Sequence, residues 1–564
     1  MNRTVKCRVK AGALPLLLSL WAGCAAGPRL EVWFVDSLEK VFPDDTEGAS
    51  LPSERWVLPR NGHLNIQLAL RPTAAVPDLG VNVRPPELAG RKLSVEVRHA
   101  GYVPVGSNPP GTPYDEVIRA APTLYPDPLL EDFPFGVEAG KTETIWITVY
   151  CPPDVNPGDY QGEIELTSGG QVLERESFRV RVVPAAVPRE QSLKVTNWFN
   201  LDEGSLRLHY NLGSGLESYW KALENIGRVM ADHKQNVLIT PVTSLTDARI
   251  EGGTIGYSFE RLDRWIEIFE KAGLLGTIEG GHLLSRASGY HTSMVIPALV
   301  IEGGRIVHKA LDPDDPRAEQ YFNSFLPALY AHLKERGWTG RYIQHIHDEP
   351  HDLEAPIYNR YAKIIRRNLP GIPTIDAVGL DQDIRFFAEV CDIWVPVLGS
   401  FDHQLRKIDQ HLKGGGRAWF YTCIFPQGRY LNRFIDHPLL KVRLLHWFNF
   451  RYNFSGFLHW GGNYWGPRPF ENVQTVINDN LTLLPAGDNA LVYPAPEKLS
   501  VLSSIRLETM REGIEDYELL AALARKDPER ARRLVERAIP HINDYMRDSR
   551  QFHKLREELL EALQ

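Results

Sequence analysis

Short apolar segments alternate with longer amphipathic segments from residue 192 to residue 460, and this alternation limits the possible folds more than any other feature. Eight of the apolar segments have the length of a β-strand, and seven of them precede a segment with helical periodicity. Strands that are joined by helices run parallel, and eight such units close into a (β/α)8 TIM barrel. We therefore expect a (β/α)8 barrel over residues 190–480.

The expected elements of the barrel follow from these two periodicities. The strands are expected at residues 192–200, 237–241, 274–279, 342–347, 373–377, 392–397, 418–422 and 456–460. The helices are expected at residues 217–233, 261–272, 317–336, 355–367, 383–390, 402–412 and 438–453. Residues from 500 onward are highly charged and keep helical periodicity, so the segment 481–564 is expected to pack as helices against the barrel.

The region before the barrel has a period of two. Between residues 29 and 188, apolar and polar residues alternate in short runs that Pro and Gly interrupt, as in Leu64–Leu70 and Tyr160–Leu166. Short strands separated by turns are typical of an antiparallel β-sandwich. The expected fold class is thus a multidomain α and β protein, with an N-terminal β-sandwich at residues 29–188, a Pro-rich linker at its end and the barrel after it.

The N-terminal segment has the pattern of an export signal. Basic residues precede an apolar run at residues 13–21, and small residues follow it up to residue 26. We expect residues 1–26 to be a signal peptide and the protein to be exported, as a periplasmic, cell-surface or secreted protein. Ala22-Gly23-Cys24 resembles a lipobox, in which Cys24 would carry a lipid anchor, whereas Trp21 departs from that pattern. Lipidation at Cys24 and simple cleavage near Ala26 are both open.

Composition and spacing argue against several other classes. The chain has 63 Lys and Arg against 71 Asp and Glu, a net charge of −8, so nucleic acid is not an expected partner. Beyond the signal, Cys151, Cys391 and Cys423 lack the spacing of a metal site. His347 and His351 are four residues apart, but the intervening proline is incompatible with the helix that a paired-histidine site needs. We expect no cofactor and no metal.

The ends of the expected strands carry the chemistry, because reactive groups in a (β/α)8 barrel lie at the C-terminal ends of its strands. The fourth strand leads into the adjacent acids Asp348 and Glu349, and aromatic residues lie on four other strands. Acids for proton transfer together with flat platforms for sugar rings are typical of a glycosidase. The side chains expected to bind the sugar are Asn197, Trp198, His347, Trp394, Tyr421, Trp460, Asn463, Tyr464 and Trp465.

The adjacency of Asp348 and Glu349 indicates a particular mechanism. Two carboxylates that act from opposite sides of a glycosidic bond stand about 5 Å or about 6.5–9.5 Å apart and normally come from different strands. Neighbouring acids suit a substrate that supplies its own nucleophile, the 2-acetamido oxygen of an N-acetylhexosamine. Asp348 would orient the acetamido group and offset positive charge, Glu349 would act as acid and base, and Tyr421 would donate to the acetamido oxygen.

This mechanism places a condition on the backbone. In a regular strand, neighbouring side chains point to opposite faces. The chain must therefore leave strand geometry at Asp348, and Pro350 is compatible with such a break. The alternative interpretation is that Asp348–Pro350 is only a polar turn that caps the following helix.

A set of motifs resembles glycoside hydrolase family 123. The similarity extends over about residues 191–522, and its motifs are His347–Pro350, Trp419–Thr422, Tyr430–Asn432, Gly456–Trp460 with Asn463–Trp465, and Ile505–Glu508 with Arg511–Tyr517. The resemblance implies an exo-acting β-N-acetylgalactosaminidase that works by substrate assistance, with the acetamido role on Asp348 and the acid/base role on Glu349. It also implies a glycan substrate, as an oligosaccharide, a glycolipid glycan or a glycoprotein glycan.

Two alternatives to this function stay open from the sequence. One is a β-N-acetylhexosaminidase that prefers a different sugar. The other is a non-catalytic carbohydrate-binding surface protein that keeps the barrel without turnover. The presence of both Asp348 and Glu349 favours an enzyme, because binding alone does not need an adjacent pair of acids.

Overall fold

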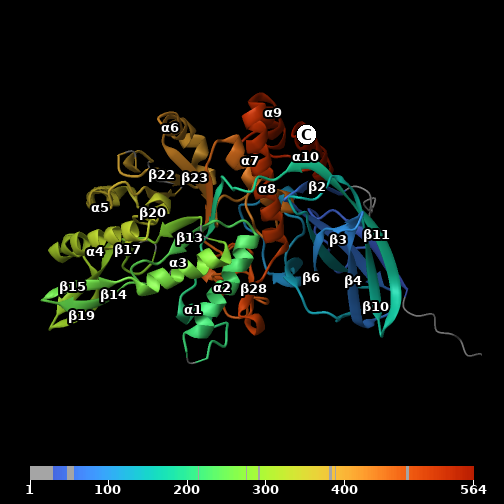
Figure 1. Ribbon diagram of the computed structural model, residues 1–564, viewed down its shortest axis with the longest axis horizontal. Helices are drawn as coiled ribbons and strands as arrows, with labels where there is room; N and C mark the ends of the chain where they lie inside the picture. Colours follow the sequence, from blue (N-terminus) through green and yellow to red (C-terminus); the bar gives the residue numbers. More distant parts are fainter. Residues whose placement is uncertain are drawn as a thin grey trace, which may run out of the picture.

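The computed structural model describes residues 29–46, 56–213, 215–274, 276–289, 292–379, 384–387, 389–477 and 482–564. The expected signal peptide at residues 1–26 and the lipidation site at Cys24 lie outside these residues. Within the described residues, no helix is both long and apolar enough to cross a membrane. The chain forms a sheet-rich N-terminal part and a parallel barrel with helices, with the C-terminal helices above and between them (Figure 1).

The N-terminal part is a β-sandwich of two sheets. One sheet has the order β1 (Leu30–Val35), β3 (His63–Pro72), β9 (Glu143–Tyr150), β6 (Ser94–Val105) and β7 (Thr123–Leu130). The other has the order β2 (Trp56–Arg60), β11 (Gln171–Ala186), β10 (Gly158–Ser168), β4 (Val76–Leu88) and β5 (Arg91–Lys92), with β8 (Phe135–Val137) beside β4.

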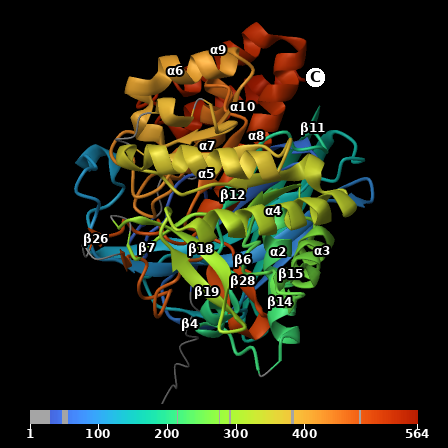
Figure 2. The same cartoon turned by 90° about the vertical axis from the view of Figure 1, so that its left-hand side faces the viewer.

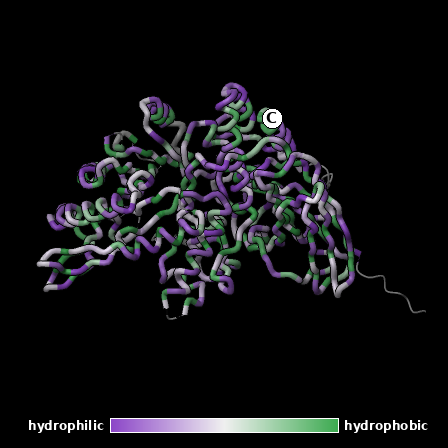
Figure 3. Tube along the Cα trace, in the orientation of Figure 1, coloured by the Kyte–Doolittle hydropathy of each residue, from purple (hydrophilic) through white to green (hydrophobic). Residues whose placement is uncertain are grey.

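The alternation in sequence explains how the two sheets pack. Hydrophobic and hydrophilic residues alternate along the strands (Figure 3), and the apolar side chains of both sheets form one buried cluster. Ile66 and Ile147 of the first sheet and Ile164 and Val180 of the second are completely buried in it. All strand pairs are antiparallel except β2 with β11, which are parallel. The predicted β-sandwich is confirmed.

The barrel has eight parallel strands, and each predicted strand overlaps one of them. They are β12 (Lys194–Asn197), β13 (Val237–Thr240), β16 (Thr277–Gly280), β20 (Tyr342–His345), β21 (Thr374–Val378), β22 (Ile393–Pro396), β23 (Arg417–Thr422) and β24 (Gly456–His459). From β13 to β24, barrel strands that are consecutive in the chain are neighbours in the sheet, and β24 also pairs with β12. The Asn236 amide donates to the Val195 carbonyl at 3.3 Å beside β13 and β12, which nearly closes the ring. The predicted barrel is confirmed.

Helices surround the barrel strands at the expected places (Figure 2). They are α2 (Glu217–Asp232), α3 (Glu260–Ala272), α4 (Pro316–Glu335), α5 (Ala355–Asn368), α6 (Phe401–Lys413) and α7 (Leu439–Arg451), with the short α1 (Glu203–Arg207) before α2. Local signals set several boundaries: Asp315 caps α4 by accepting from the Arg317 amide, and Gly273 ends α3 at φ 85°. The helix expected at residues 383–390 is instead represented by a 3-10 turn at Ile384–Phe387.

Two insertions that the sequence did not suggest extend from the strand ends. A hairpin of β14 (Asp247–Glu251) and β15 (Thr254–Ser258) follows β13, and β17 (Ser285–Arg286), β18 (Met294–Glu302) and β19 (Arg305–Leu311) follow β16. Both project at the end of the molecule far from the sandwich (Figure 1). The second insertion matters for function, because β17 carries Arg286 to the end of β20.

The C-terminal segment joins the two parts of the molecule. After the small pairs β25 (Val476–Ile477) with β26 (Thr482–Leu483) and β27 (Tyr493–Ala495) with β28 (Ser500–Leu502) come α8 (Ile505–Lys526), α9 (Pro528–Ala538) and α10 (Ser549–Ala562). Helix α8 packs on α7 and forms buried ion pairs with the sandwich. Arg506 contacts Asp127 at 2.7 Å, and Glu508 contacts Arg98 at 2.7 Å. The helices therefore cover the barrel and also fix the sandwich to it.

Candidate active site

The acidic pair lies on a sharp turn directly after β20. The strand ends at His345, and Glu349 has a backbone φ of +44°, a left-handed conformation that a residue with a side chain rarely adopts. The chain thus leaves strand geometry between these two residues, as the adjacency of Asp348 and Glu349 requires. Asp348 is exposed and Glu349 is half-buried, at the C-terminal end of the barrel strands.

Arg286 holds the turn from one side. Its guanidinium donates to the carbonyl oxygens of Glu349 at 2.9 Å and of Asp348 at 3.4 Å. The same guanidinium forms an ion pair with Glu354 at 2.8 Å, and both side chains are nearly buried, at 10% and 13% exposure. Glu354 in turn accepts from the amide of His351 at 2.8 Å. These contacts link both ends of the turn through one cation.

Asp376, on β21, holds the turn from the other side. Its carboxylate accepts from the backbone amides of Ile346 at 3.1 Å and of His347 at 3.3 Å, the two residues between the strand and the acidic pair. Tyr358 donates its hydroxyl to the same carboxylate at 2.6 Å. A carboxylate that accepts from successive amides fixes the direction in which the chain leaves the strand.

A buried histidine connects this carboxylate to a second one. His345 Nδ1 lies 3.0 Å from Asp376 Oδ1, and His345 Nε2 lies 2.7 Å from Glu279 Oε1, with all three side chains completely buried. Glu279 also accepts from the Thr196 hydroxyl at 2.9 Å and from the Trp198 indole at 3.0 Å. Burial lowers the pKa of His345, but the hydrogen bonds and charges of Asp376 and Glu279 outweigh it and raise that pKa to about 9.

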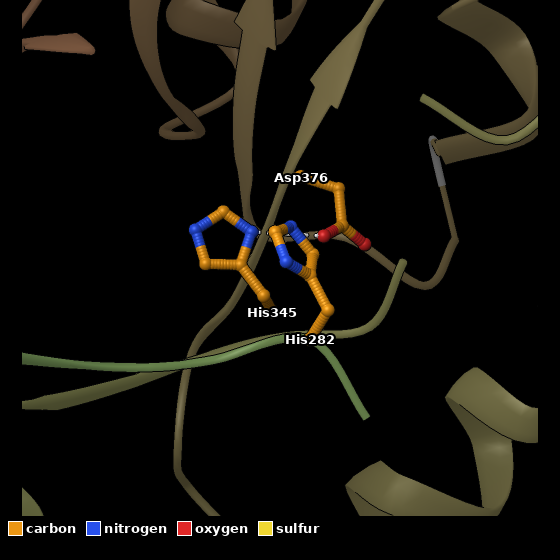
Figure 4. Close-up of side chains that lie close together, drawn as sticks. All are labelled: His282, His345 and Asp376. Carbon is orange, nitrogen blue, oxygen red and sulfur yellow. Dashed lines mark hydrogen bonds and ion pairs between the residues drawn. The ribbon is translucent and has the colours of Figure 1, made fainter. Parts of the chain in front are cut away.

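One group of described residues has the spacing that a metal ion would need. His282, His345 and Asp376 each offer one ligand atom, and these atoms lie within 4.8 Å of one another (Figure 4). Hydrogen bonds already occupy both ring nitrogens of His345 and both oxygens of Asp376. The donor set therefore fits a hydrogen-bonded network better than a metal centre.

The electrostatic environment separates Asp348 from an ordinary surface acid. Asp348 is reached by solvent, yet protein surrounds it densely enough that desolvation raises its pKa to about 6. The charge of Asp376 adds to this increase, whereas His345 and Arg286 lower the pKa. Asp348 is thus largely ionised at neutral pH and is neutralised by mild acid.

Several of the predicted sugar-binding residues lie beside the acids. Tyr421 donates its hydroxyl to Glu349. Burial raises the pKa of Tyr464 to about 12, and the nearby charge of Asp348 contributes to this increase. The ring of Trp460 lies 5.2 Å from that of Tyr464, and the ring of Trp198 lies 5.6 Å from that of His345. Tyr421 and Tyr464 thus lie beside the acids, Trp460 packs on Tyr464, and Trp198 packs on His345 beneath the acids.

His347 comes directly before Asp348 and differs from the two acids in that it carries no charge at neutral pH. It is buried, and neither ring nitrogen has a hydrogen-bond partner among the described residues. Burial and then the charge of Arg286 lower its pKa to about 4, so it is a neutral imidazole at neutral pH.

Two other predicted residues face the outside of the barrel. Trp394 lies between Ile393 and Val395, which point into the barrel, so its ring packs outward on His411 at 3.7 Å. Thr196 and Trp198 both donate to Glu279 inside the barrel. Asn197 lies between them, so its side chain points to the other face of the strand, where its amide donates to Gln235 at 2.8 Å.

Asn463 and Trp465 are used in holding the loop after β24. Asn463 accepts from the Asn200 amide at 2.7 Å and donates to the Asn200 carbonyl at 3.0 Å. Trp465 donates to the Val492 carbonyl at 2.8 Å and lies 5.1 Å from the ring of His209. The structure does not bring these two side chains to the acidic pair.

Sequence reasoning missed the residues beneath the acids, namely Glu279, Arg286, His345 and Asp376. A signal for two of them existed, because Glu279 and Asp376 are acidic residues inside expected apolar strands. Buried acids are rare unless they are paired, so an acid inside an expected apolar strand indicates an ion pair or a functional site.

An eight-stranded barrel with adjacent acids and aromatic rings at the C-terminal ends of its strands is the architecture of a glycoside hydrolase. The model of the glycoside hydrolase 123 catalytic domain matches residues 209–523, which is more than half of the chain. The chain therefore belongs to glycoside hydrolase family 123, a family of hydrolases that act on glycans.

A solved structure shows the same fold. A family 123 glycoside hydrolase from Clostridium perfringens, from work on glycolipid glycan hydrolysis, has a TM-score of 0.72 at 17% identity, with 95% of this chain and 97% of that chain covered. A family 39 glycoside hydrolase from Bacteroides cellulosilyticus WH2 has a TM-score of 0.36 at 13% identity, with 78% and 80% covered. No curated protein matches the sequence. The similarity to the Clostridium structure extends over both the sandwich and the barrel.

Proposed function

We propose that this protein is an exported, exo-acting glycoside hydrolase that removes terminal β-linked N-acetylgalactosamine by substrate-assisted, retaining catalysis. The observation that carries the proposal is the turn after β20, which presents two adjacent acids at the mouth of the barrel. Burial and then the charge of Asp488 raise the pKa of the Cys423 thiol, directly after β23. Glu349 and Asp348 lie close enough to contribute to the same increase. Both acids therefore lie within electrostatic reach of the end of β23.

The first step breaks the glycosidic bond. The acetamido oxygen of the substrate attacks C1, and the bond between C1 and the leaving oxygen breaks as an oxazolinium ion forms. Glu349 gives its proton to the leaving oxygen, while ionised Asp348 accepts a hydrogen bond from the acetamido N–H and offsets the positive charge. Tyr421 then turns its hydroxyl from Glu349 to the acetamido oxygen.

The second step restores the sugar. Water attacks C1 on the face that the leaving group left, Glu349 accepts the proton of this water, and the C1–oxygen bond of the oxazolinium ring breaks. The product is the free sugar with its original anomeric configuration. Trp460 and Tyr464 would contact the faces of the bound ring, and a glycolipid glycan is one class of substrate that fits this chemistry.

A comparison of nitrophenyl β-glycosides tests the proposal. We expect N-acetylgalactosaminide to be hydrolysed fastest, Glu349→Gln to abolish turnover, and Asp348→Asn to lower the rate by on the order of 10²-fold. Equal rates on the galactoside would contradict substrate assistance, since galactose has no acetamido nucleophile. A faster rate on N-acetylglucosaminide would indicate a different sugar preference. Binding without any turnover would indicate a carbohydrate-binding protein.

Export is proposed from the order of basic, apolar and small residues in the segment 1–26. Mass spectrometry of the mature protein tests it and distinguishes a lipid on Cys24 from cleavage near Ala26. An unprocessed N-terminus would contradict export.

A further inference from the structure

The group formed by Glu279, His345 and Asp376 lies directly beneath the acidic pair, and neither step of the proposed reaction uses it. Its geometry defines its protonation state. A neutral imidazole has one N–H and one lone pair, but both nitrogens of His345 face carboxylate oxygens, at 2.7 and 3.0 Å. A neutral ring would direct a lone pair at one of these oxygens. A doubly protonated ring donates to both.

The other contacts of the two carboxylates support the ionised arrangement. Glu279 accepts from Thr196 and Trp198, and Asp376 accepts from Tyr358 and two backbone amides. Donors that converge on a carboxylate stabilise its charged form. Burial raises the pKa of Asp376, and the charge and hydrogen bond of His345 oppose this increase.

His282 is the remaining titratable ring that faces His345. It follows β16, and its ring centre lies 4.5 Å from that of His345. Burial, followed by the positive charge of His345, holds the pKa of His282 well below its ordinary value. His282 is therefore neutral, and His345 is the ring of this pair that carries the proton.

We infer that His345 is a positioning residue for the reaction, a buried cation that keeps the Asp348 carboxylate charged and that fixes Asp376 where it holds the turn of the acidic pair. This inference rests on the proposed function, because it assigns the charge of Asp348 to substrate assistance. Two observations link His345 to Asp348. The charge of His345 acts to keep Asp348 ionised. Asp376, the partner of His345, accepts from the amides of Ile346 and His347, which lie between His345 and Asp348 in the chain.

Glu279→Gln is the informative variant, because it removes one negative charge with little change in shape, at the cost of the Trp198 hydrogen bond to Oε1 when the amide nitrogen takes that position. Its amide N–H can donate to Nε2 of a neutral His345, while Nδ1–H still donates to Asp376. His345→Gln removes the ring altogether. His446→Gln is the matched control, because His446 is also completely buried but lies on α7 and contacts Asn449.

Nitrogen-15 NMR of histidine-labelled protein measures the cation directly, with the His345 signal assigned from its absence in His345→Gln. We expect both ring nitrogens of His345 to be protonated at pH 8 in the wild type and only one in Glu279→Gln. A neutral His345 in the wild type would overturn the inference. Zinc binding that changes this signal and that a chelator reverses would also overturn it, because the ring would then serve a metal.

The pH dependence of kcat/KM measures the effect on Asp348. Loss of a nearby cation raises the pKa of a carboxyl, so the acidic limb should move to higher pH by about one unit or more in Glu279→Gln and in His345→Gln. The limb should not move in His446→Gln. A uniform loss of rate with an unmoved limb would show a merely structural role and would overturn the inference.

The two proposals fail in different ways. If the wild type hydrolyses none of the glycosides, the proposed function fails, and the NMR measurement still decides whether His345 is a cation. If the wild type is active but its acidic limb does not respond to the two variants, the proposed function stands and the role of His345 is refuted.

Discussion

Replacing Arg286 with Met should lower activity without unfolding the protein, and the structure allows the size of this effect to be worked out. Arg286 makes two hydrogen bonds to the carbonyls of Asp348 and Glu349 and one ion pair with Glu354. These contacts offset the left-handed conformation of Glu349, which costs a residue with a side chain about 1–2 kcal/mol. Methionine keeps much of the apolar stem and removes every donor.

The magnitude follows from the hydrogen bonds that are lost. A hydrogen bond to a charged group contributes about 1.5–3 kcal/mol, and a loss of about 2 kcal/mol in the productive turn lowers the rate about 30-fold. We therefore expect Arg286→Met to lower kcat/KM on the nitrophenyl β-N-acetylgalactosaminide by about 10- to 100-fold. Most of the loss should appear in kcat, because the turn positions the two acids for the step that breaks the glycosidic bond.

Steady-state kinetics on purified protein measures this, with thermal unfolding as a check on the fold. Arg60→Met is the matched control, because Arg60 also donates to a backbone carbonyl, that of Pro184 at 2.8 Å, but it is on the sandwich. A kcat/KM within twofold of the wild type for Arg286→Met would refute the idea that this cation holds the acidic pair. A similar loss in the control would point to a general effect.

Three further predictions concern pH, stability and metal removal. The wild-type kcat/KM should fall about tenfold as the pH is lowered from 7 to 5, because Asp348 with a pKa of about 6 is ionised above that value and neutral below it, and an acidic limb near pH 4 would contradict this. Arg506→Met should reduce the free energy of unfolding in a denaturant titration by about 3–5 kcal/mol, because it leaves the completely buried Asp127 with the Tyr493 hydroxyl but without its ion-pair partner. Exposed Arg532→Met on α9 should have little effect and serves as its control. Prolonged treatment with a metal chelator should leave kcat/KM unchanged, because hydrogen bonds occupy the polar atoms of His345 and Asp376, and a loss that zinc restores would refute this reasoning.

The order of the barrel elements could be predicted because its signals are local. Each strand and helix shows its own period within fewer than about twenty residues, and short connections make consecutive units adjacent. The position of Asp348 and Glu349 followed from the same order, since they come directly after an expected strand. The required break in strand geometry also followed, and the left-handed conformation of Glu349 provides it.

The orientation of side chains on short strands was harder to predict. Trp394 and Asn197 lie on barrel strands, but their neighbours face the interior, so these two side chains face outward. Buried parallel strands are apolar on both faces, and the sequence therefore does not show which face is which. Asn463 illustrates a second reason, because its amide is used by the backbone of Asn200, 263 residues away in sequence.

The sequence by itself determined the strand and helix order, the placement of an adjacent acid pair at a strand end and the chemistry that such a pair suits. Only the tertiary structure decided what lies beneath and around the pair. Glu279 and His345 are in contact although they are 66 residues apart in sequence. Arg286 lies in an insertion with no periodic signal and donates to Glu349, 63 residues away in sequence. Local propensities act over one or two turns of the chain. The charge and direction of these side chains are instead set by strands that come together when the barrel closes, so these contacts depend on the tertiary structure.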